Sequence, residues 1–88
     1  MFRIQYGVNT QTKFNRSTRI ALEQCCDEYL RYGNITVENV FECINEMLDT
    51  DHEEYNKNSC YMEYGFGSTI TVEIVVLKQD YVEINLYW

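Results

Sequence analysis

The sequence predicts an α+β domain of two layers, with the element order β-α-α-β-β-β and two helices packed on a mainly antiparallel four-stranded sheet. Apolar and polar residues alternate in one N-terminal and three C-terminal segments, as they do in half-buried strands. Two intervening segments instead repeat apolar residues every three or four positions, as amphipathic helices do. With 88 residues, the chain has room for a single domain over residues 1–88.

The first two elements are expected to be a strand and a helix. Residues 2–8 alternate apolar and polar side chains, which predicts a strand, and the polar stretch 9–16 predicts a loop. Ser17 or Thr18 can cap a helix whose apolar residues recur at helical spacing. The Gly-Asn pair at 33–34 supplies its stop.

A second helix is expected almost at once, with the clearest periodic pattern in the sequence. Thr36 is a candidate N-cap, and Ile35 and Val40 have the spacing of a hydrophobic staple. Apolar residues of the following segment fall on one stripe, which predicts that this face packs on the sheet. The stripe consists of Val37, Val40, Phe41, Ile44, Met47 and Leu48.

The C-terminal half is expected to begin with a loop and to continue as three strands. Residues 49–59 are polar enough for a solvated loop. Strands are expected at 60–66, 69–77 and 81–88, and the short turns between them predict an antiparallel meander.

Alternate side chains of these strands should face the helices, while the other face of the sheet meets solvent. The set expected to face the helices is Met62, Tyr64, Ile70, Val72, Ile74, Val76, Val82, Ile84, Leu86 and Trp88. The set expected on the open face is rich in Tyr and Glu: Tyr61, Glu63, Thr69, Thr71, Glu73, Tyr81, Glu83, Asn85 and Tyr87.

The charge is strongly acidic and unevenly distributed. The chain has 14 Asp and Glu against 7 Lys and Arg, a formal net charge of −7. Residues 1–31 hold five bases and three acids, a net +2, whereas residues 32–88 hold two bases and eleven acids, a net −9. Direct binding to nucleic acid or to an anionic membrane depends on Lys and Arg, so we expect neither.

The carboxylates concentrate on one face of the second helix and in the segment after it. On the helix they recur three or four positions apart, opposite the apolar stripe and with no base among them. Like charges at this spacing cost a helix roughly 0.2–0.5 kcal/mol per pair, so helix stability does not explain them. They can imitate a phosphate backbone and bind a basic groove, or they can simply keep a solvated face soluble. The candidate partner-binding residues are Glu38, Glu42, Glu46, Asp49, Asp51, Glu53, Glu54 and Tyr55.

Few residues suit metal binding or catalysis, and we expect no metal, no cofactor and no enzymatic activity. The segment from Asp49 begins like a calcium loop, but Glu54 replaces the required glycine and Cys60 the bidentate glutamate. The four cysteines include no C-x₂₋₄-C pair, which favours free thiols over a zinc site or a disulfide. With one histidine, no glycine-rich phosphate loop and no nucleophile elbow, the sequence contains no catalytic constellation.

The sequence also suggests where the protein acts. No basic N-terminal stretch precedes an apolar run, and no segment approaches the roughly 18 apolar residues of a membrane span. We therefore expect a cytoplasmic protein whose cysteines are reduced.

In size, acidity and two-layer α+β plan, the chain resembles the small acidic inhibitors that phages carry against host nucleic-acid machinery, such as anti-CRISPR and anti-restriction proteins. The resemblance covers the whole chain as a profile, but no motif carries it and those proteins share no single fold, so no functional residue is transferred. It implies a stoichiometric, DNA-mimic-like inhibitor of a basic protein partner in the host cytoplasm. Two alternatives are an immunity protein or antitoxin that neutralises a nuclease, and a structural domain that self-associates into a homodimer through its open Tyr/Glu sheet face or its terminal strand.

Overall fold

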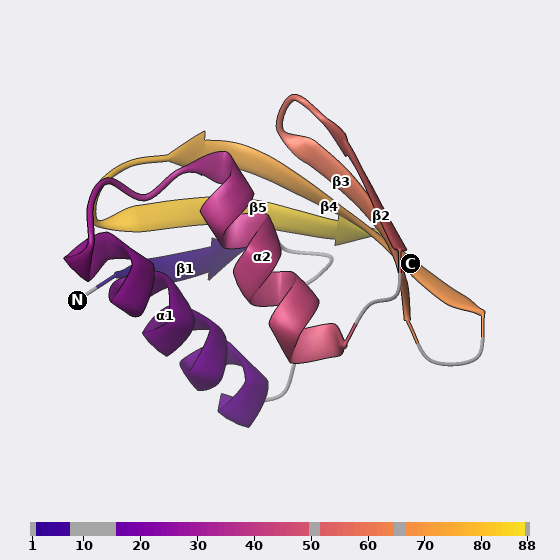
Figure 1. Ribbon diagram of the computed structural model, residues 1–88, viewed down its shortest axis with the longest axis horizontal. Helices are drawn as coiled ribbons and strands as arrows, with labels where there is room; N and C mark the ends of the chain where they lie inside the picture. The colour runs from indigo at the N-terminus through magenta and orange to yellow at the C-terminus, as the bar shows by residue number, and fades with distance from the viewer. Residues whose placement is uncertain (1, 8–15, 50–51, 65–66, 88) are drawn as a thin grey trace.

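The structure is a computed structural model of the chain, and its described residues form two helices and five strands (Figure 1). It describes residues 2–7, 16–49, 52–64 and 67–87, with only the backbone at 52–56 and 64. In chain order, the elements are β1 (Arg3–Tyr6), α1 (Arg16–Arg31), α2 (Val37–Leu48), β2 (His52–Asn56), β3 (Ser59–Tyr64), β4 (Ser68–Leu77) and β5 (Tyr81–Tyr87).

The predicted fold class, an α+β domain of two layers, is confirmed. Both helices lie on one side of the sheet, with α1 packed on β1 and α2 on β3 and β4 (Figure 1). The strand order is β1-β5-β4-β3-β2. β1 runs parallel to β5, and the other neighbouring pairs are antiparallel, including the predicted meander of β3, β4 and β5. Neither α1 nor α2 is long and apolar enough to cross a membrane.

The sheet has a fifth strand where the sequence predicts a loop. β2 pairs antiparallel with β3 from His52 opposite Glu63 to Asn56 opposite Ser59. A two-residue turn joins the two strands, and Lys57 there has a left-handed φ of 55°. β2 is an edge strand, which needs only one neighbour, so pairing with β3 can hold a polar segment in a strand. The prediction of a loop over residues 49–59 is therefore wrong at 52–56 and at Ser59, which belong to β2 and β3.

Helix α2 begins and ends at residues whose side chains or backbone suit those positions. The Thr36 hydroxyl accepts a hydrogen bond from the Asn39 N–H at 3.2 Å, and the Asn39 side-chain oxygen accepts one from the Thr36 N–H at 3.2 Å. This capping box satisfies two backbone donors at the N-terminus. At the other end, Asp49 adopts a left-handed conformation, with φ 51°, and donates its N–H to the Asn45 carbonyl.

One core fills the space between the layers. Its buried apolar residues come from both helices and from the strands, and most of the set predicted to face the helices is among them. These residues are Phe2, Leu22, Cys26, Ile35, Val40, Phe41, Cys43, Ile44, Cys60, Met62, Ile70, Val72, Ile74, Val82, Ile84 and Leu86. Two others predicted for this set, the Trp88 residue and the Tyr64 side chain, lie outside the described part of the chain.

A β-bulge in β4 reverses the predicted alternation at its end. Ile74 is opposite Ile84, but the next paired residue is Val76, opposite Glu83, so Val75 is the extra residue. Val75 is 46% exposed. Because paired residues share a face, Val76 lies with Glu83 on the open face, and Leu77 joins Val82 against the core. The prediction that Val76 faces the helices is therefore wrong.

We predict that Thr36→Ala lowers the free energy of unfolding by about 1 kcal/mol, because it removes the acceptor for the Asn39 N–H. Thr36→Ser keeps a hydroxyl and should retain most of the stability. Urea denaturation followed by circular dichroism measures both effects. Equal midpoints for the alanine variant and the parent would contradict a capping role for Thr36.

Candidate functional site

The acidic side chains of α2 form a row on its solvent face. Glu38, Glu42 and Glu46 are exposed, as is Asp49 immediately after the helix. The opposite face of the same helix contains four buried residues, Val40, Phe41, Cys43 and Ile44. We call the four exposed carboxylates the acidic row. They are half of the residues that the sequence proposes for partner binding.

The other proposed residues are divided between β2 and the part of the chain that is not described. Glu53, Glu54 and Tyr55 belong to edge strand β2, where they pair in register with Met62, Tyr61 and Cys60. Only the backbone of these three residues is described, and Asp51 lies outside the described residues. The structure therefore places the acidic row on α2 and the next three candidates on a strand that begins a few residues later.

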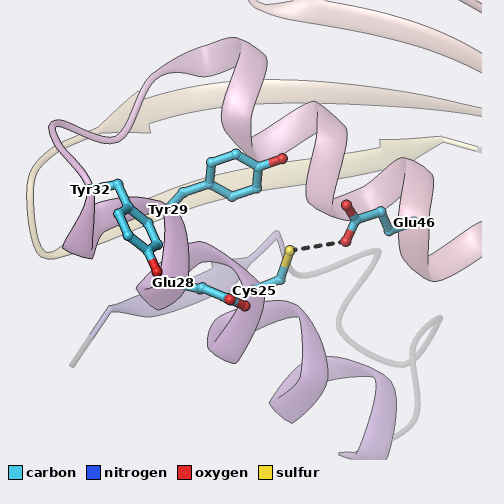
Figure 2. Close-up of a pocket in the computed structure, with 5 residues that line it drawn as sticks. All are labelled: Cys25, Glu28, Tyr29, Tyr32 and Glu46. Carbon is cyan, nitrogen blue, oxygen red and sulfur yellow. Dashed lines mark hydrogen bonds between the residues drawn. The ribbon is translucent and has the colours of Figure 1, made fainter.

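A groove between the two helices adjoins the acidic row. It has a volume of about 250 Å³ and is lined by Cys25, Glu28, Tyr29 and Tyr32 from α1 and its end, and by Glu46 from α2. Figure 2 shows the Tyr29 ring reaching from α1 toward α2, with Tyr32 at the end of α1. We call this feature the interhelical groove. Glu46 belongs to both the groove and the acidic row, so the two features form one continuous surface.

The thiols beside the groove are held in their protonated form. The Cys25 thiol donates to the Glu46 carboxylate at 3.5 Å (Figure 2). Burial raises the pKa of Cys25 well above its ordinary value, and the Cys43 thiol and the Glu46 charge raise it further. The pKa of Cys43 is raised by a hydrogen bond with Cys26 and by burial. Only a thiolate acts as a nucleophile or metal ligand, so these thiols are suited to packing rather than chemistry.

No metal-binding group is found in the described residues, where no set of three His, Cys, Asp or Glu side chains converges on one point. All four cysteines are free. His52 belongs to edge strand β2, while Cys43 lies on α2 and Cys60 on β3.

The Tyr29 phenol lies in a negative electrostatic potential inside the interhelical groove. The pKa of its phenol is raised by partial burial and then by the negative charge of Glu46, with a smaller effect from Glu42. Both carboxylates therefore act on the space between the helices as well as on the outer surface of α2. A cation entering the groove would meet an attractive potential, because that potential disfavours a second negative charge.

Sequence reasoning missed the contribution of α1 to this surface. Glu28 and Tyr32 lie four positions apart near the end of α1, so they share one helix face. That spacing was a detectable signal, but it does not reveal which neighbouring element the face meets. Only the packing of α1 beside α2 brings these residues to Glu46.

The open face of the sheet is a second exposed surface and contains the predicted tyrosines. Tyr61 is 40% exposed and Tyr87 is 53% exposed. They occupy one cross-strand row, because each pairs with Thr71. Glu73 in the adjacent row accepts hydrogen bonds from the Asn85 amide at 3.1 Å and from the Tyr87 hydroxyl at 3.4 Å.

The fold and the site together define a two-layer α+β domain with an acidic helix face and an adjoining groove. Neither a protein-family model, nor a curated protein, nor a solved structure matches the chain. Its function is therefore inferred from the chemistry of its own surfaces.

We predict that Cys25 reacts with iodoacetamide at pH 8 at least about tenfold more slowly than cysteine in an unstructured peptide, because its thiolate is scarce. Its rate should still be rising at pH 10, since the raised pKa delays deprotonation beyond the ordinary value near 8.5. Peptide mapping by mass spectrometry gives the rate at this site.

Glu46→Gln should accelerate the reaction of Cys25, because it removes the adjacent negative charge. Glu38→Gln makes the same change elsewhere on α2 and should have little effect. A plateau in the rate near pH 8.5 in the parent protein would be inconsistent with the protonated thiol.

Proposed function

We propose that this protein is a small acidic inhibitor that binds a protein partner by occupying its basic nucleic-acid-binding surface. The observation that carries the proposal is the division of α2 into an apolar face with four buried residues and an exposed acidic row. The row contributes nothing to the core. Its like charges are mildly unfavourable for the helix, so a role in binding gives a reason for its presence.

The geometry of the row suits a surface that binds a phosphate backbone. Carboxylates four residues apart on a helix recur about every 6 Å along its axis, which is roughly one charge per two nucleotides of a DNA strand at about 3.4 Å each. Complementary potentials accelerate association and make it dependent on ionic strength. The acidic row would therefore recruit a basic partner quickly and lose it as salt rises.

This mode of action needs neither catalysis nor a cofactor. We infer a binding protein rather than an enzyme, which acts in the cytoplasm, or in the host cytoplasm if a phage encodes it. An immunity protein or antitoxin that neutralises a basic nuclease would use the same surface. Of these two functions, we favour a phage counter-defence inhibitor of the anti-CRISPR or anti-restriction type, because the chain resembles such proteins in size, acidity and α+β plan.

A second candidate function is self-association through the open sheet face. It is favoured by the exposure of Tyr61 and Tyr87 in one row, because tyrosine is enriched at protein interfaces. A homodimer formed in this way would bury the sheet face and leave the acidic row free.

We predict that the tagged protein captures a nucleic-acid-binding protein from host lysate at low salt, and that high salt or added DNA releases it. Reversal of Glu42, Glu46 and Asp49 to lysine should abolish capture, because it replaces the attractive potential by repulsion. Mass spectrometry identifies the captured protein, and an electrophoretic mobility assay tests whether the captured protein loses its nucleic acid.

The matched control reverses Glu63, Asp80 and Glu83, which changes the net charge equally but alters the sheet face and an adjacent turn. This control should retain capture. Loss of the partner in the control, with capture intact in the α2 triple variant, would refute the helix surface. A protein that captures only itself, and elutes as a dimer on size exclusion, would favour the homodimer.

A further inference from the structure

The interhelical groove is not explained by the acidic row alone, because most of its lining comes from α1 and its end. We propose that this groove receives one arginine side chain of the partner, held between the ring of Tyr32 and the carboxylates of Glu28 and Glu46. The proposal rests on the proposed function, since it names the chemical group that anchors a basic partner.

The groove has carboxylates on both of its walls, and the described residues that line it include no cation. Glu46 accepts a hydrogen bond from the neutral Cys25 thiol, and the described structure gives Glu28 no polar partner. Arg31, one turn beyond Glu28, lines a neighbouring pocket with Gln24, Asp27 and Glu28, so Glu28 lies between the groove and this arginine. The groove therefore carries two negative charges from two different helices, and a single cation placed between them can interact with both.

The end of α1 adds a second, independent attraction for a cation. The Tyr32 N–H donates to the Tyr29 carbonyl at 3.1 Å and the Gly33 N–H to the Leu30 carbonyl at 3.3 Å, which closes the last turn of the helix. The C-terminus of a helix carries roughly half a negative charge from its aligned peptide dipoles. Tyr29 and Tyr32 thus place the groove beside a helix end that favours positive charge.

The aromatic residues of the groove distinguish arginine from lysine. Tyr32 is 87% exposed, the highest value among the exposed large apolar and aromatic side chains of the described chain. Its ring contributes little to the core, and its exposed face is available for stacking. A guanidinium group is planar, stacks on aromatic rings and pairs with a carboxylate through two hydrogen bonds. The ammonium group of lysine is compact and strongly hydrated, so it gains less from the same site.

The volume and the burial of the groove fit an extended side chain better than a separate small molecule. At about 250 Å³, the groove is smaller than most pockets for drug-sized ligands. Tyr29 is partly buried, whereas Tyr32 and Glu28 are exposed. An arginine can place its methylene stem along the tyrosine rings while its guanidinium group reaches the carboxylates.

The test is an NMR titration of the ¹⁵N-labelled protein with acetylated, amidated tetrapeptides of arginine, lysine or citrulline. The arginine peptide should shift the backbone amide signals of residues 25–33 and of Glu46. It should bind about two- to fivefold more tightly than the lysine peptide, which is the range of an exposed cation–π contact. The citrulline peptide has the same shape without charge, and no binding is expected.

Two variants and two matched controls assign the effect to the groove. Tyr32→Ala and Glu28→Gln change exposed side chains, so both should fold normally, and each should reduce arginine binding to the level of lysine. Tyr87→Ala removes an exposed tyrosine from the sheet face, and Glu38→Gln removes an exposed carboxylate of α2 outside the groove. These controls should change arginine binding by less than about twofold.

The outcomes separate this proposal from the proposed function. Equal binding of the arginine and lysine peptides, or equal losses in Glu28→Gln and Glu38→Gln, would show diffuse electrostatic attraction and overturn the arginine site. Target capture that is lost on reversal of the acidic row but survives Tyr32→Ala together with Glu28→Gln would also overturn the site, while the inhibitor function would stand. Capture that survives both sets of changes would overturn the inhibitor function itself.

Discussion

Helix α2 is held against the sheet by four side chains that lose essentially all contact with solvent: Val40, Phe41, Cys43 and Ile44. Full burial of a large apolar side chain contributes roughly 1.5–3 kcal/mol, whereas like charges four positions apart cost only about 0.2–0.5 kcal/mol per pair. Burial therefore decides how the helix is rotated about its axis. With 3.6 residues per turn, that rotation forces Glu38, Glu42 and Glu46 into solvent, so the core fixes the position of the acidic row.

The same anchoring determines the groove, because α1 must pack beside α2. Leu22 and Cys26 are the buried residues of α1, and the small Cys26 side chain lies in hydrogen-bonding contact with Cys43. At the sheet side, the Phe2 N–H donates to the Asp27 carboxylate at 2.5 Å, which joins the start of the chain to α1. With α1 held by these contacts, its last turn lies alongside Glu46. The position of Glu28 and Tyr32 is thus a consequence of core packing.

Periodicity in the sequence is sufficient to predict those elements whose pattern results from burial. It identifies the α2 stripe and the inward residues of β3, β4 and β5. These residues pack in the core, and their burial requires the apolar side chains that make up the pattern. It misses β2, since pairing with β3 stabilises a polar edge strand that has no apolar pattern of its own. It misplaces Val76 because one extra residue at Val75 shifts the alternation. Of the candidate site, the acidic row follows from spacing on one helix, whereas the groove depends on how two helices pack.

The two exposed surfaces differ in how far their charges are already satisfied, and this difference favours the helix side for a basic partner. On the sheet face, Glu73 accepts two hydrogen bonds within the protein, and Lys78 lies 5.6 Å from the centre of the Tyr81 ring. Arg3 pairs in register with Tyr81 at the same end of the sheet, so cations are interspersed with the carboxylates there. A basic partner would meet mixed charge on that face and would have to displace existing bonds. On the helix side, α2 has no base in its last turn, and the described residues that line the interhelical groove include none. Arg31 lies at the outer edge of this surface, where it lines the neighbouring pocket with Glu28. Because electrostatic complementarity sets both association rate and partner choice, the helix side is the better match for a surface that evolved to bind phosphates.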